Sequence, residues 1–138
     1  MNEPEKSLRP LAFIIGEWAG EGQSFGQPIK GHLQAKRRFQ NTFIQIEEKL
    51  FLPDGSLDYE DCSWIGLDPA QNRLSVTHFM APATIERKLL LLNETGFYWW
   101  VGPTDPIVWF TSVDHNLRIR VTSTNDEVLG EMHYKRIG

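Results

Sequence analysis

Apolar and polar residues alternate along most of the chain from Trp18 onward. No window keeps the i, i+3, i+4, i+7 spacing of an amphipathic helix for three turns. Short segments rich in Gly, Pro, Asn and Asp, such as residues 102–106, interrupt the alternation as tight turns do. The pattern predicts ten strands, at approximately residues 17–24, 29–39, 42–52, 57–67, 73–80, 84–92, 97–101, 107–113, 117–123 and 128–137.

Consecutive strands with short connections predict an all-β fold. A long, twisted antiparallel sheet tends to close because closure removes its exposed edges, so we expect an up-and-down barrel of about ten strands. Residues 7–16 are the helix candidate, and Pro10 suits a first helical turn. We expect this segment to form a short plug at one end of the barrel, and residues 1–138 to form a single domain.

Composition narrows the possible partners and the location. The net charge is -4, and the basic residues are scattered apart from Lys36 to Arg38, which argues against a nucleic-acid partner. Cys62 is the single cysteine, so no intramolecular disulfide is expected. The sequence shows neither the pattern of a signal peptide nor a long apolar run. These features predict a soluble cytoplasmic protein without membrane insertion.

The alternation also predicts which side chains face the barrel interior, because successive strand residues point to opposite sides of a sheet. Glu48 shares a face with Ile44 and Ile46, and Arg87 shares a face with Ile85 and Leu89. The predicted interior is mostly apolar, and the side chains expected to contact a ligand are Glu48, His78, Arg87, Tyr134, Trp99 and Met132.

The polar side chains of this interior need partners, because a buried ion without one costs several kcal/mol. One interpretation is an ion pair between Glu48 and Arg87, with His78 and Tyr134 hydrogen-bonded nearby. A second is that Arg87 and Tyr134 hold the acidic head of a mostly apolar ligand, since arginine offers a bidentate fork. Both interpretations, and exposure at the open mouth of the barrel, remain alternatives.

A second cluster is aromatic and covers residues 97–100 and 108–110. Its alternation makes the strand apolar on both faces, and it predicts Trp100 and Phe110 on the outer face. Contiguous exposed apolar side chains usually mark interfaces. We therefore expect a covering loop or a homodimer contact through Trp100 and Phe110.

Motifs for catalysis and metal binding are not found in the sequence. It contains no Gly-x-Ser-x-Gly, no His-Glu-x-x-His and no phosphate-binding loop before a helix. The four histidines lie on separate predicted elements without metal-ligand spacing. No catalytic residue and no metal site are predicted, although an enzyme that uses His78 and Glu48 as acid and base remains an alternative.

The segment Gly16-Glu17-Trp18 behind the predicted plug, together with Arg136 on the last strand, resembles the Gly-x-Trp motif and C-terminal basic residue of the calycins. This superfamily includes lipocalins and fatty-acid-binding proteins. The resemblance implies a calycin-like barrel in which the basic side chain lies against the tryptophan and closes the base, as cation–π attraction favours. Residues 11–22 look most like the opening of nitrobindin-type barrels.

Resemblance to nitrobindins implies a b-type haem held by a histidine on the last strand, several residues before a Tyr-Lys pair. Here the pair is Tyr134-Lys135, and the ligand position holds Leu129. In fatty-acid-binding proteins an Arg-x-Tyr triplet on that strand holds a carboxylate, and here the triplet is residues 132–134, which retains only the tyrosine. The sequence therefore disfavours haem.

Together these features predict a barrel that binds a small, largely apolar ligand such as a lipid, with an acidic head group as one option. Haem binding of nitrobindin type and an acid–base enzyme are the alternatives.

Overall fold

The computed structural model describes residues 2–101 and 106–138. These residues form two short helical segments and eleven strands. The elements are α1 (Glu3–Ser7), the 3₁₀ helix η1 (Arg9–Ile14), β1 (Gly16–Ser24), β2 (Gln27–Arg38), β3 (Phe43–Phe51), β4 (Leu57–Asp68), β5 (Arg73–Met80), β6 (Thr84–Leu89), β7 (Leu91–Asn93), β8 (Gly96–Trp100), β9 (Ile107–Val113), β10 (Asn116–Thr122) and β11 (Val128–Arg136). The turn predicted at residues 102–106 lies, apart from Pro106, outside the described residues.

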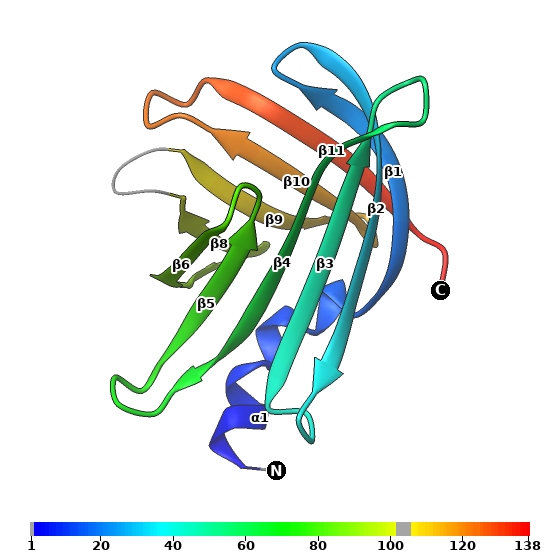
Figure 1. Ribbon diagram of the computed structural model, residues 1–138. Helices are drawn as coiled ribbons and strands as arrows, with labels where there is room; N and C mark the ends of the chain where they lie inside the picture. Colours follow the sequence, from blue (N-terminus) through cyan, green and yellow to red (C-terminus); the bar gives the residue numbers. More distant parts are fainter. Residues whose placement is uncertain (1, 102–105) are drawn as a thin grey trace.

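The strands form one antiparallel sheet in the order β6-β5-β4-β3-β2-β1-β11-β10-β9-β8-β7. The first strand pairs with the last, and Trp18 on β1 lies opposite Arg136 on β11. This pairing curls the sheet into a nearly closed barrel (Figure 1). The prediction of an all-β antiparallel barrel is confirmed, and the architecture is compatible with a calycin-like fold.

The predicted strand at residues 84–92 is two strands in the structure. Leu90 interrupts it: its side chain is buried, and its backbone N–H donates to the Leu74 oxygen at 3.1 Å. Before this point β6 pairs with β5, and after it β7 pairs with β8. The chain therefore changes partners at Leu90, and β6 and β7 are the two outer strands of the sheet order.

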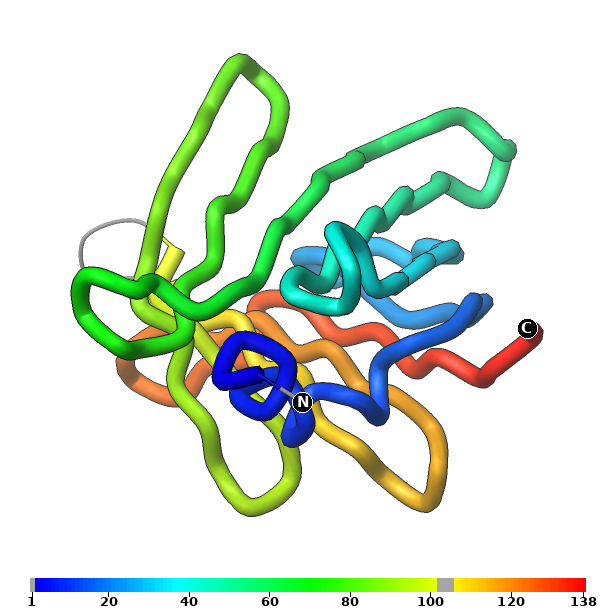
Figure 2. Tube along the Cα trace, turned by 90° about the horizontal axis from the view of Figure 1, so that it is seen from below, coloured from blue at the N-terminus to red at the C-terminus, as the bar shows by residue number. Residues whose placement is uncertain are grey.

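The N-terminal segment covers one end of the barrel (Figure 2). Helix α1 begins after Asn2, whose side chain accepts a hydrogen bond from the Glu5 N–H at 2.9 Å. Leu8, Leu11 and Ile14 are buried in the core. The predicted plug is thus present, although it begins earlier than expected and most of it is a 3₁₀ helix. No helix within residues 2–101 and 106–138 is long and apolar enough to cross a membrane.

Trp18 lies at the base of the barrel against this plug. Its side chain is buried, and its indole Nε1–H donates to the Ile14 oxygen at 2.9 Å. The Arg136 guanidinium lies over the indole ring, 4.3 Å from the centroid, and donates to the backbone oxygens of Phe13 and Ile15. At Gly16, where φ is +139°, a Cβ atom would overlap the Arg136 guanidinium. Glycine therefore allows Arg136 to reach both the indole and the plug.

Candidate functional site

A cavity of about 480 Å³ lies inside the barrel, away from the plug. Phe25 in the β1–β2 turn and Asp58 at the start of β4 contribute to its lining, and no residue of α1 or η1 does. Its apolar lining includes Ile29, Ile46, Trp99, Val108, Phe110 and Met132. The barrel interior is thus divided into a packed end beneath the plug and a hollow end opposite to it.

Stacked aromatic rings form one wall of the cavity. Phe110 on β9 lies opposite Phe97 on β8, with ring centroids 4.8 Å apart, and it also stacks against Trp99 at 5.4 Å. The prediction that Phe110 faces outward is wrong, because the register between β8 and β9 places it on the inner face. Trp100 is half-buried beside Tyr98, with ring centroids 5.8 Å apart. A dimer contact on this outer face stays a prediction. Trp100 could take part in it, whereas Phe110 faces the interior and could not.

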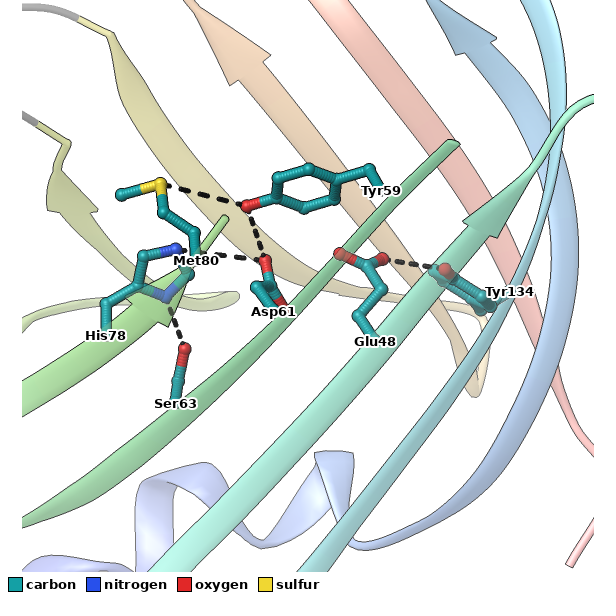
Figure 3. Close-up of polar contacts among 7 residues, drawn as sticks. All are labelled: Glu48, Tyr59, Asp61, Ser63, His78, Met80 and Tyr134. Carbon is teal, nitrogen blue, oxygen red and sulfur yellow. Dashed lines mark hydrogen bonds and ion pairs between the residues drawn. The ribbon is translucent and has the colours of Figure 1, made fainter. Parts of the chain in front are cut away.

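Glu48 on β3 points into the interior and is 8% exposed. The Tyr134 hydroxyl on β11 donates to Glu48 Oε2 at 2.6 Å (Figure 3). Two strands, β2 and β1, separate β3 from β11 in the sheet, so this bond spans the curve of the barrel. Gly31 on β2 makes the bond possible, because a Cβ atom there would overlap the Tyr134 hydroxyl.

Burial controls the protonation of this pair. It raises the pKa of Glu48 from its ordinary 4.5 to about 7, against the opposing effect of the Tyr134 hydrogen bond. Burial and the nearby Glu48 charge also raise the pKa of Tyr134 above its usual value. Tyr134 therefore stays a protonated donor, and Glu48 gains or loses its proton near neutral pH.

A second carboxyl, that of the largely buried Asp61 on β4, lies beside Glu48. The two residues are direct partners in the β3–β4 register, so their side chains point to the same face. The Tyr59 hydroxyl donates to Asp61 Oδ2 at 2.9 Å (Figure 3). Burial, and to a lesser extent the charge of Glu48, raises the pKa of Asp61 well above its ordinary value. Because ionisation of one carboxyl opposes ionisation of the other, the two groups titrate as a pair.

His78 on β5 is the cavity's one lining histidine among the described residues. Its Nδ1 lies 2.7 Å from Ser63 Oγ, and its Nε2 lies 3.8 Å from Asp61 Oδ2, beyond hydrogen-bond range. Burial lowers the pKa of His78, against the opposing charge of Glu86. The imidazole is therefore neutral at pH 7, with Nε2 directed toward Asp61 across a gap.

The prediction for Arg87 is wrong. Its side chain is 61% exposed and forms an ion pair with Asp68 at 3.1 Å on the outside of the barrel. Its register partner on β5 is Thr77, whereas Glu86 lies opposite His78. The predicted pairing of Arg87 with Glu48 is therefore not formed, and Arg87 is not available for an acidic ligand.

Of the other predicted ligand-binding residues, Glu48, His78, Trp99 and Met132 line the cavity, and Tyr134 reaches it through its bond to Glu48. Sequence reasoning missed three polar lining residues that share one face of β4, namely Tyr59, Asp61 and Ser63. Their signal was present, because they alternate in step with the buried Ile65.

The haem ligand that the resemblance to nitrobindins implies is not found on β11. Leu129 supplies no ligand atom, and His133 on the same strand is exposed and does not line the cavity; its Nε2 lies 3.1 Å from Glu131 Oε1. In the cavity, His78 has Ser63 at one ring nitrogen and Asp61 facing the other. Within residues 2–101 and 106–138, no group of three or more His, Cys, Asp or Glu side chains could hold a metal ion.

Comparison of the sequence with protein families and with curated proteins found no match. Function is therefore inferred from the cavity and its side chains.

Proposed function

We propose that this protein binds a small, largely apolar ligand inside its barrel. The observation that carries the proposal is the cavity of about 480 Å³, with its apolar and aromatic lining and a few polar groups that converge on one side. Ligand sites in proteins typically combine these features. The Gly16-Glu17-Trp18 segment and the stacking of Arg136 on Trp18 support placing the barrel among the calycins, whose members include lipid carriers.

The closed base indicates how the ligand enters. The plugged end is filled by Leu8, Leu11 and Ile14, which belong to the packed core. None of these three residues lines the cavity. Phe25 lines the cavity and is 78% exposed, so it lies at the rim of the opposite end. The ligand enters past this rim and places its apolar part against Trp99 and Phe110.

The proposal can be tested by filling the cavity. Val108 on β9 lines the cavity, whereas Val113 on the same strand is 40% exposed and does not. Val108→Trp should abolish the fluorescence increase of the neutral apolar probe Nile red, and Val113→Trp should leave it unchanged. Native mass spectrometry of protein that was never denatured would detect a retained ligand. Equal Nile red binding by both variants would contradict binding inside the barrel.

One observation favours acid–base catalysis as a second candidate function. Glu48 has a pKa of about 7, which suits a group that accepts and donates protons at neutral pH. The polar contacts of His78, however, are with Ser63 and Asp61 rather than with Glu48. If the protein is an enzyme, a ligand that it retains should change mass on incubation with the native protein and not with Glu48→Gln.

A further inference from the structure

The polar side of the cavity is acidic. Glu48 and Asp61 lie within it, and Asp58 lies at its rim. Among the described lining residues none is Lys or Arg, and the neighbouring His78 is held neutral by burial. An anionic head group placed here would meet carboxyl groups without a compensating cation, which is costly in a water-poor interior.

Both buried carboxyls have acceptor capacity to spare. A carboxylate offers about four lone-pair sites. Glu48 receives one hydrogen bond from Tyr134, and Asp61 receives one from Tyr59. Neither tyrosine has a second hydroxyl proton to donate, so the pair of carboxyls is suited to a group that brings further N–H or O–H donors.

The imidazole of His78 lies beside this pair of carboxyls and lines the same cavity. Its Nε2 and Asp61 Oδ2 are 3.8 Å apart, and the His78 side chain is 6% exposed. The Trp99 ring lies close to the imidazole, with centroids 5.9 Å apart, so an aromatic surface adjoins the polar one. A protonated nitrogen at this place would face carboxyl oxygens and also an aromatic ring, which attracts cations.

We propose that the ligand of this cavity is a lipophilic amine, whose protonated nitrogen donates hydrogen bonds to Glu48 and Asp61 while its apolar body lies against Trp99 and Phe110. This inference depends on the proposed ligand-binding function and names the chemical class of the ligand. It replaces the acidic head group considered from the sequence, because Arg87 lies outside the barrel.

The test compares three unbranched probes of ten carbon atoms, namely decylamine, decanol and decanoic acid. Each displaces Nile red from the intact protein at about pH 8, where the amine is protonated and the acid is ionised. We expect decylamine to bind at least about tenfold more tightly than decanol, because hydrogen bonds between charged partners exceed neutral ones. Decanoic acid should bind more weakly than decanol.

Two variants and a matched control locate the amine. Glu48→Gln and Asp61→Asn should each reduce the preference for decylamine over decanol by about tenfold while leaving decanol binding in place. Glu47→Gln makes the same change of charge one residue away, on the exposed face of β3, and should keep the preference. Decanol binding shows that each variant has folded and retains its cavity.

The outcomes separate this inference from the proposed function. If decylamine binds no more tightly than decanol, or decanoic acid binds as tightly as decylamine, the inference is overturned while ligand binding stands. The inference also fails if Glu47→Gln removes the preference as fully as Glu48→Gln, because a surface charge then holds the amine. If Nile red does not bind and native mass spectrometry detects no complex with any of the three probes, both proposals fail.

Discussion

The two ends of the barrel interior differ in whether their polar groups have complementary partners. At the plugged end, the Trp18 Nε1–H has an acceptor, and the Arg136 guanidinium is bonded to two plug carbonyls and stacked on the indole. At the hollow end, Glu48 and Asp61 lie side by side without a cation among the described lining residues. The first arrangement stabilises the fold, whereas the second keeps two carboxyls in surroundings that disfavour their ionisation.

The largest expected effect is at the plugged end. Trp18→Ala should lower the free energy of unfolding by about 3 to 5 kcal/mol, because it removes a large buried aromatic side chain. Arg136→Ala should cost less, since the Arg136 side chain lies at the exposed surface of the base. Urea unfolding measures both. Trp100→Ala is the control on the outer face of β8 and should cost less than Trp18→Ala. A loss below about 1 kcal/mol at Trp18 would show that the base does not support the barrel.

At the hollow end, ionisation of Glu48 should lower the stability of the fold as the pH rises. Its pKa is raised from 4.5 to about 7 in the folded protein, so the folded state binds more protons than the unfolded state between these values. Its contribution to stability is therefore fully present below about pH 4.5 and is lost as the pH rises through about 7, by about 3 kcal/mol.

Glu48→Gln tests this by removing the charge while keeping an oxygen for the Tyr134 hydroxyl. The variant should unfold at a higher urea concentration than the native protein at about pH 8, and the difference should shrink toward about pH 4.5. The control Glu47→Gln should follow the native profile. A native stability that rises steadily from about pH 4.5 to about pH 7, with no gain in the variant, would mean that Glu48 is not a buried acid.

A smaller effect is expected at Gly31, which makes room for the Tyr134 hydroxyl. Gly31→Ala should force that hydroxyl away from Glu48 and cost about 1 to 3 kcal/mol in urea unfolding. Gly130→Ala is the matched control, because a Cβ atom there would come no closer than 3.5 Å to the Gln23 oxygen. Equal effects of the two changes would show that the bond between Tyr134 and Glu48 does not depend on this space.

The smallest effect is expected at Arg87, which belongs to neither end. Arg87→Met removes an exposed ion pair with Asp68, so the free energy of unfolding should change by less than about 1 kcal/mol. Binding of decylamine, decanol and decanoic acid should not change either. If Arg87→Met lowered the free energy of unfolding by several kcal/mol, the result would instead support the buried ion pair with Glu48 that the sequence pattern suggested.

The inner faces of β3 and β5 could be predicted from the sequence. Glu48 alternates with Ile44 and Ile46, and His78 alternates with Leu74 and Val76, so apolar neighbours identified the inward positions. On β4 the inward positions near the cavity are polar, so alternation in step with Ile65 was the one sign that Asp61 and Ser63 are interior. A rule based on apolar neighbours fails where a strand contributes mainly polar groups to a site.

The pattern also failed where strand pairing changes. Residues 84–92 appear as one strand in the sequence, but the strand is interrupted at Leu90. Before this residue β6 pairs with β5, and after it β7 pairs with β8. On β6 the exposed positions include Ile85 and Arg87, the reverse of the predicted face. Local alternation divides the residues of a strand between two faces. Only the pairing with the neighbouring strand decides which face is buried.

By itself, the sequence determined the strand rhythm, the turns and the N-terminal plug, because each depends on residues close together in the chain. The contacts of the cavity were decided by the tertiary structure. Tyr134 and Glu48 are 86 residues apart, and they meet because β1 pairs with both β2 and β11, with Gly31 leaving space between them. Contacts across a barrel depend on register and closure, which arise from all the strands together.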